Sequence, residues 1–219
     1  MGEASAETKR KIIESARQEF LDKGFTGASL RIIAARAGVT TGALYRHFAD
    51  KDALFCALVD GAIEATTNAI MTADVLTHQS ATDVLGAEHA EDEKQTLARM
   101  LDYIYEDFDA FTLLLTKAAG STHEHFVEEM CDLYTKNCLE TFTWMYEQQY
   151  AAHQVDEMTV HVIATSIINA FAEIIQHRIP KEKAIAFITD IREFFHFGTM
   201  HMMGIPCGAA ASSPGMAEN

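Results

Sequence analysis

Residues 29–48 carry two consecutive helical patterns separated by a glycine, and they constrain the fold more than any other part of the chain. Ser29 can cap a first short helix that ends at Gly38, and Thr40 can cap a second one. The apolar residues expected to face inward are Leu30, Ile33, Ala34, Ala37, Leu44 and Phe48. Because two short helices joined by a glycine-containing turn form a helix-turn-helix, the segment predicts this motif.

The remaining sequence is also patterned as helices. We find no sustained period-2 alternation and no hairpin turn between β-branched runs. A first helix is expected between Ser5 and Gly24, with Ile13, Ala16 and Phe20 on its buried stripe. Longer helices are expected at about 51–72, 92–118, 123–150, 156–178 and 181–203, with Pro180 separating the last two. The predicted fold class is all-α.

The composition is that of an ordinary globular protein. Of 219 residues, 48% are hydrophobic and 22% are charged, which excludes collagen-like, disordered and disulfide-scaffold classes. Uncharged apolar runs stay shorter than the roughly 18 residues of a membrane span, and the N-terminus is polar, so we expect a cytoplasmic protein without a membrane segment. The cysteines form no C-x-x-C pair, which favours reduced thiols: Cys56, Cys131, Cys138 and Cys207.

Charge is distributed unevenly along the chain. Residues 1–55 hold nine Lys or Arg and seven Asp or Glu, a net charge of +2, whereas the rest holds eight and twenty-five, a net charge of −17. An acidic body repels nucleic acid, so any DNA contact must come from the N-terminal segment.

The sequence at residues 29–48 is SLRIIAARAGVTTGALYRHF, and it continues with ADKDALF. It resembles the DNA-binding signature of the TetR family of bacterial transcriptional regulators. The turn at Gly38, the Gly42 that begins the recognition helix and the Lys51 that follows stand where the family pattern places them, and the match covers about residues 8–60.

The resemblance implies a division of the chain into two helical domains. Residues 1–52 would form an N-terminal three-helix DNA-binding domain, and residues 53–204 a C-terminal helical domain for effector binding and dimerisation. The residues from 205 to 219 are small and polar, and we expect them to form a flexible tail.

A recognition helix enters a major groove about 12 Å wide with its first residues facing the base edges. Small residues at the N-terminal end of the helix allow close approach to the bases. Hydroxyl, guanidinium, imidazole and ammonium groups further along the chain can donate hydrogen bonds to phosphates. The candidate DNA-binding residues are Thr26, Ser29, Arg31, Thr40, Thr41, Gly42, Tyr45, Arg46, His47 and Lys51. Thr40 has the alternative role of an N-cap only, and His47 that of a packing residue.

One recognition helix buries too little surface for tight operator binding, so a dimer that reads two half-sites is expected. The helices at about 156–178 and 181–203 carry more apolar width than one protected face requires, which predicts a four-helix dimer interface. The C-terminal helix pair has this role in the TetR family.

The middle helices are rich in aromatic and methionine side chains. Such linings suit an apolar small-molecule pocket, although a plain core has the same composition. The candidate ligand-binding residues are Met100, Tyr105, Phe108, Phe111, Tyr134, Phe142, Met145 and Phe171.

Ten histidines raise the question of a metal or haem site. His123 and His125 lie two residues apart, and His196 and His201 five apart, so neither pair places two imidazoles on one helix face. No cysteine joins them at ligand spacing, and we expect no metal and no cofactor.

The function predicted from these features is a homodimeric regulator, a repressor that binds a palindromic double-stranded operator and is released by a small, largely apolar effector. One alternative is a regulator of the same fold without an effector, acting as an activator or controlled by a protein partner. A helical enzyme is the remote alternative, because no phosphate loop, dinucleotide fingerprint or Gly-x-Ser-x-Gly motif is present.

Overall fold

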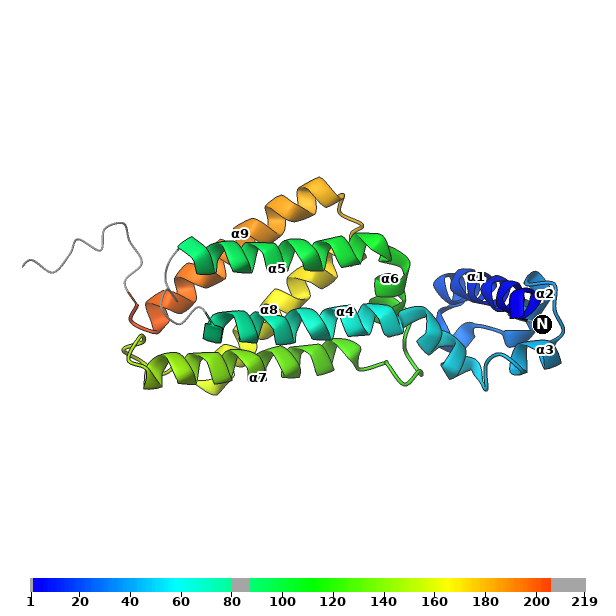
Figure 1. Cartoon of the computed structure of the whole chain (residues 1–219), viewed down its shortest axis with the longest axis horizontal. Helices are drawn as coiled ribbons and strands as arrows, with labels where there is room; N and C mark the ends of the chain where they lie inside the picture. The colour runs from blue at the N-terminus through cyan, green and yellow to red at the C-terminus, as the bar shows by residue number, and fades with distance from the viewer. Residues whose placement is uncertain (1, 80–86, 206–219) are drawn as a thin grey trace, which may run out of the picture.

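The computed structural model describes residues 2–79 and 87–205, and within these residues all of the regular secondary structure is α-helix, as predicted (Figure 1). The helices are α1 (Gly2–Gly27), α2 (Leu30–Arg36), α3 (Thr41–Tyr45), α4 (Lys51–Gln79), α5 (Ala87–Glu106), α6 (Phe108–Thr116), α7 (Phe126–Glu147), α8 (Glu157–Gln176) and α9 (Lys181–Met202). Almost all of the predicted tail at 205–219, including Cys207, lies outside the described residues.

Several of the expected helix boundaries were wrong: the helix expected at 51–72 extends to Gln79, and the one expected from 92 begins at Ala87. The single helix expected at 92–118 is interrupted at Asp107, whose carboxylate accepts a hydrogen bond from Ala110 N at 3.2 Å and caps α6. The helix expected from 123 begins instead at Phe126, because residues 117–125 form a series of turns. Near the N-terminus, the expected stop at Gly24 appears as a break inside α1, where its φ of 69° is a conformation that glycine adopts readily.

Helices α1, α2 and α3 form a compact unit at one end of an elongated molecule, and the remaining helices form a bundle at the other (Figure 1). Helix α4 begins beside α3 and runs the length of the bundle, where it packs on α5, α6 and α7. Helix α8 packs between α7 and α9, and α6 also contacts α1. Helix α4 therefore connects the N-terminal unit to the body without a flexible linker.

One hydrophobic core runs from the N-terminal unit into the bundle. The rings of Phe20, Phe25 and Phe55 meet where α1 crosses α4, with centroid distances of 5.2, 5.4 and 6.1 Å. The buried stripe of α1 is centred on Ile12, Ala16 and Phe20, all at 0% exposure, whereas Ile13 is only partly buried. The expected stripe was therefore correct except for one position.

Two helical segments are long and apolar enough to cross a membrane by length and composition alone, namely Lys51–Thr72 of α4 and Glu157–Gln176, which is α8. Both pack against neighbouring helices and contribute fully buried side chains, such as Phe55 from α4 and Ile174 from α8, to the protein core. A core helix passes the same test, so this property is weak evidence for a membrane span.

The aromatic cluster generates a stability prediction. Phe20→Ala should lower the free energy of unfolding by about 3–5 kcal/mol, because it removes a fully buried ring between two others. Urea unfolding followed by circular dichroism measures the change. Ile32→Ala is the control, since its side chain is 48% exposed and should change stability by less than about 0.5 kcal/mol. Equal effects of the two substitutions would contradict the packing described.

Candidate nucleic-acid interface

Helices α2 and α3 are joined by a tight turn that fixes the angle between them. Gly38 has a φ of 72°, and Val39 N donates to Ala34 O at 2.9 Å to close the end of α2. Thr40 caps α3, because its hydroxyl oxygen accepts a hydrogen bond from Ala43 N at 3.1 Å. The predicted helix-turn-helix is therefore present, with the second helix starting at the predicted cap.

Helix α3 is held by two anchors that point into the core. Leu44 is 0% exposed and Phe48 is 6% exposed, and both belong to the cluster that includes Ile33 and Ala34 of α2. With this face buried, α3 turns its other face outward. The candidate residues exposed there are Thr40, Gly42, Tyr45 and Arg46.

Other candidate residues surround this face with varying accessibility. Thr41 and His47 are half-buried, and Arg31 is exposed near the start of α2. Ser29 occupies the N-cap position of α2 as expected, but its side chain makes no capping hydrogen bond. Its backbone N–H instead donates to the buried carboxylate of Glu19 at 3.3 Å.

Two candidate DNA-binding residues are engaged within the protein. The Thr26 hydroxyl donates to Ala119 O at 2.7 Å. The Lys51 ammonium lies 3.3 Å from Thr26 O and 3.5 Å from Ala28 O, and 4.6 Å from the centre of the Phe25 ring. Both side chains therefore stabilise the end of α1 in this conformation.

The N-terminal unit contacts the body through specific polar bonds as well as through α4. Arg17 of α1 forms a two-pronged ion pair with Asp107 at the start of α6, and this partner raises the pKa of the guanidinium. Phe25 N donates to Lys117 O at 2.8 Å in the connection between α6 and α7. A displacement of α6 or of this connection would thus also move α1, which is bonded to both.

The body contains an apolar cavity of about 110 Å³. Its lining side chains come from α4, α5, α6, α7 and α8, and nearly all of them are hydrophobic. Four of the predicted ligand-binding residues line it: Met100, Phe111, Tyr134 and Phe171.

The other four predicted residues lie elsewhere. Tyr105 donates to Ile179 O and lies against Phe108, with the ring planes tilted by 40° and the ring centroids 5.7 Å apart. Phe142 and Met145 belong to a separate cluster with Met200 and Met203. Their aromatic or thioether character matched a pocket lining, but the same character serves core packing.

Sequence reasoning missed the contribution of α4 to the cavity and, apart from Phe171, that of α8. Most of the missed residues are aliphatic or small, including Ala69, Ile70, Ile168, Ala172 and Ile175. Only their spacing on the inward faces of two long helices could have indicated them, and such spacing does not distinguish a cavity wall from solid core.

The architecture is thus a helix-turn-helix unit attached to a helical bundle with an internal apolar cavity. Residues 12–58 match the family model described as "Bacterial regulatory proteins, tetR family". The chain is 30% identical over 135 residues to the HTH-type transcriptional regulator TtgR of Pseudomonas putida, a match that covers 60% of this chain and 57% of TtgR. It is 44% identical over 55 residues to the HTH-type transcriptional repressor BepR of Brucella suis, covering 25% of this chain and 26% of BepR.

Solved structures of the same fold extend the similarity to the body. NalD, described as the secondary repressor of the MexAB-OprM multidrug efflux pump in Pseudomonas aeruginosa, superimposes with a TM-score of 0.61 at 18% identity, covering 90% of this chain and 97% of NalD. PfmR of Thermus thermophilus gives a TM-score of 0.55 at 21% identity, covering 82% and 96%. Residues 12–58 are thus similar to the DNA-binding region of the TetR family of bacterial regulatory proteins, the chain spans little more than half the length of TtgR, and the described helices share the fold of these solved regulators.

Proposed function

We propose that the protein is a DNA-binding transcriptional regulator that acts as a homodimeric repressor and is released by a small apolar effector. One observation carries the DNA-binding part. The exposed end of α3 presents small and polar residues, Thr40 and Gly42 followed by Tyr45, over a core that fixes the helix rigidly.

The small residues at this end of α3 support close approach to a major groove. Gly42 has no side chain, and a Cβ there would meet only Thr40 Oγ1 at 4.0 Å, so its small size is not needed for packing. Close approach to a base edge is a reason for glycine that the fold itself does not supply. Tyr45 is 51% exposed and Arg46 is also exposed, so both can reach phosphates flanking the groove.

The charge distribution supports binding by this unit. The first 55 residues carry a net charge of +2, and the remaining residues carry −17. DNA would therefore be attracted to the helix-turn-helix end of the elongated molecule and repelled by the bundle. This uneven charge would orient the helix-turn-helix toward the DNA before any contact with a base forms.

The homodimer is proposed on the exposed apolar side chains of α8 and α9. Phe194 is 72% exposed, Val162 and Phe197 are each 56% exposed, and Ile185 is 48% exposed. Large apolar side chains exposed on two neighbouring helices are typical of a surface that a partner covers. A second copy would cover them in a four-helix arrangement and would place two α3 helices for two half-sites.

The cavity is the proposed effector site. At about 110 Å³ it is comparable with a hydrophobic cavity of roughly 150 Å³ that admits benzene in another protein. It lies between α4 and α6, both of which contact the N-terminal unit, so a ligand that spreads these helices would change the position of α3. The ligand can shift the equilibrium between the DNA-binding conformation and the conformation that does not bind DNA only by the difference between its binding free energies for the two.

The DNA-binding proposal predicts that Gly42→Ala weakens operator binding without loss of stability. A Cβ is tolerated by the fold and should raise helix stability by up to about 1 kcal/mol, but it would stand between α3 and the groove. Fluorescence anisotropy on a duplex selected from a random pool by the wild-type protein measures affinity, and thermal unfolding measures stability. Tyr45→Ala should weaken binding across all duplexes, since it removes a phosphate contact.

The exposed Ile32→Ala of α2 is the matched control for these substitutions, and its DNA affinity should change less than that of the α3 variants. Wild-type affinity in both Gly42→Ala and Tyr45→Ala would contradict the proposed docking of α3.

The dimer proposal predicts the effect of a charge on the exposed apolar surface. The wild-type protein should sediment at about twice the chain mass of 24.2 kDa, and Phe194→Glu should sediment as a monomer, because burying a carboxylate in an interface is costly. Tyr103→Glu, at a side chain of α5 that is 45% exposed, is the control and should stay dimeric. A monomeric wild-type protein at micromolar concentration would overturn the proposal.

The effector proposal predicts that toluene, used as a probe of the cavity, raises the thermal midpoint of the wild-type protein. Ala172→Leu should remove this response, because the larger side chain fills the cavity from α8. A change of Ala170, which is buried on the same helix but does not line the cavity, to Val is the control and should keep the response. A toluene shift that persists in Ala172→Leu would place the binding site elsewhere.

A further inference from the structure

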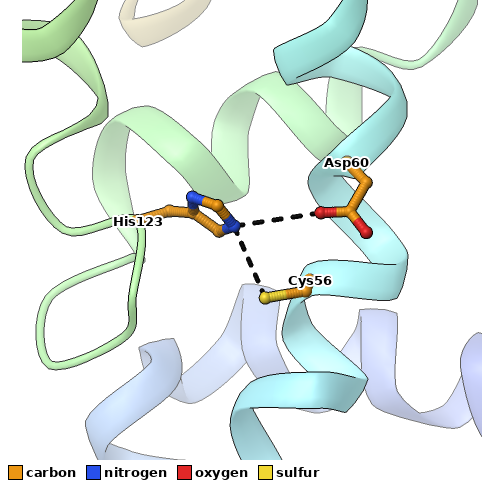
Figure 2. A group of neighbouring side chains, drawn as sticks. All are labelled: Cys56, Asp60 and His123. Atoms are coloured by element: carbon orange, nitrogen blue, oxygen red, sulfur yellow. Dashed lines mark hydrogen bonds and ion pairs between the residues drawn. The ribbon is translucent and has the colours of Figure 1, made fainter.

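Three potential metal ligands meet at the junction between the N-terminal unit and the body (Figure 2). Cys56 and Asp60 lie one turn apart on α4, and His123 comes from the connection between α6 and α7. The Cys56 sulfur is 3.4 Å from His123 Nε2, which in turn is 3.8 Å from Asp60 Oδ1. Figure 2 shows the three side chains converging on one point from two separate elements.

We propose that Cys56, Asp60 and His123 form a binding site for a divalent transition-metal cation, with Zn²⁺ as the matching ion. A thiolate, an imidazole and a carboxylate are the ligand types that Zn²⁺ takes, whereas Mg²⁺ and Ca²⁺ prefer oxygen alone. Three protein ligands leave one tetrahedral position for water or a further ligand.

The distances fit tetrahedral coordination without a large rearrangement. Zinc bonds of about 2.3 Å to sulfur and about 2.0–2.1 Å to nitrogen or oxygen place neighbouring ligand atoms about 3.3–3.6 Å apart. All three ligand atoms already lie within 4.8 Å of one another. Small rotations of Asp60, whose side chain is 67% exposed, would complete the geometry.

The surrounding charge favours a cation. Asp52 Oδ2 lies 3.7 Å from the Cys56 sulfur, so two carboxylates flank the thiol. Burial and the negative charges of Asp52 and Asp60 raise the pKa of Cys56 to about 11. The same negative field stabilises a bound cation, which replaces the thiol proton.

The histidine is held in place before any ion binds. His123 N donates to Ser121 Oγ at 3.1 Å, and Asp52 accepts hydrogen bonds from both the backbone N–H and the hydroxyl of Thr122. The side chain of His123 is only 20% exposed. The connection is therefore ordered around α4, so that little conformational entropy would be lost on binding.

The site lies where binding can affect the N-terminal unit. The connection that carries His123 also accepts hydrogen bonds from Phe25 N at Lys117 O and from the Thr26 hydroxyl at Ala119 O. A metal bridging Cys56 and His123 would fasten this connection to α4 and stabilise the orientation of α1 seen here. This regulatory consequence rests on the proposed function, whereas the binding site does not.

The test is a titration of the chelator-treated full-length protein with CoCl₂, followed by absorbance. We expect one Co²⁺ per chain, a thiolate-to-cobalt charge-transfer band in the near ultraviolet, ligand-field bands of tetrahedral Co²⁺, and loss of these signals when ZnCl₂ is added. Cys56→Ser should abolish the charge-transfer band, and His123→Gln and Asp60→Asn should each weaken Zn²⁺ binding by at least about tenfold.

His125→Gln is the matched control, since His125 is exposed, lies two residues from His123 and is not part of the group; it should bind like the wild type. Thermal unfolding without metal verifies that each variant is folded, and Zn²⁺ should raise the midpoint of the wild type but not of Cys56→Ser. Absence of the charge-transfer band in the wild type, or its persistence in Cys56→Ser, would overturn the site.

A DNA measurement separates this site from the proposed function. If Zn²⁺ changes the affinity of the wild type for its selected duplex, and not that of Cys56→Ser, the regulatory role is supported. Unchanged affinity in a protein that binds both Zn²⁺ and DNA would overturn that role while leaving the site intact. A protein that binds Co²⁺ as described but no DNA would contradict the proposed function alone.

Discussion

The contact between α1 and α4 is the interaction on which the rest of the structure depends. Phe20 and Phe55 cross at nearly right angles with their ring centroids 5.2 Å apart, and both are completely buried. This contact fixes the N-terminal unit on the helix that continues into the bundle, and the same core anchors α3 through Leu44. Because a packed core deforms little, a movement of α4 is transmitted to α3 and is not absorbed between them.

Polar bonds at the junction give this rigid unit a second attachment to the body. Arg17 pairs with Asp107 at the start of α6, and Thr26 bonds to the following connection. The apolar cavity lies on one side of α6, and the Cys56, Asp60 and His123 group lies where the connection meets α4. Two chemically different ligands could therefore act on the same element, one by spreading the bundle helices and the other by fastening the junction.

The fold class and the helix-turn-helix were predictable because their signals are local. Thr40 as a cap, glycine at position 38 and apolar residues at i and i+4 act within a few residues, and the structure has each of them. The break at Asp107 was missed because an aspartate within an apolar helical pattern is consistent with two structures. It can be an exposed residue of one continuous helix or the N-cap of a new helix. The cavity and the metal group depend on contacts between distant segments, such as Cys56 and His123, which are 67 residues apart, and residue spacing carries no information on them.

The central claim is that the helix-turn-helix end of this acidic protein binds a specific DNA site. The most direct measurement is a titration of the wild-type protein against a duplex from the region upstream of its own gene, with an unrelated duplex as competitor, at several salt concentrations. The account predicts selective binding by two protomers per site, with an affinity that falls as salt rises because phosphate contacts release counterions. Binding to neither duplex at any salt concentration would contradict it.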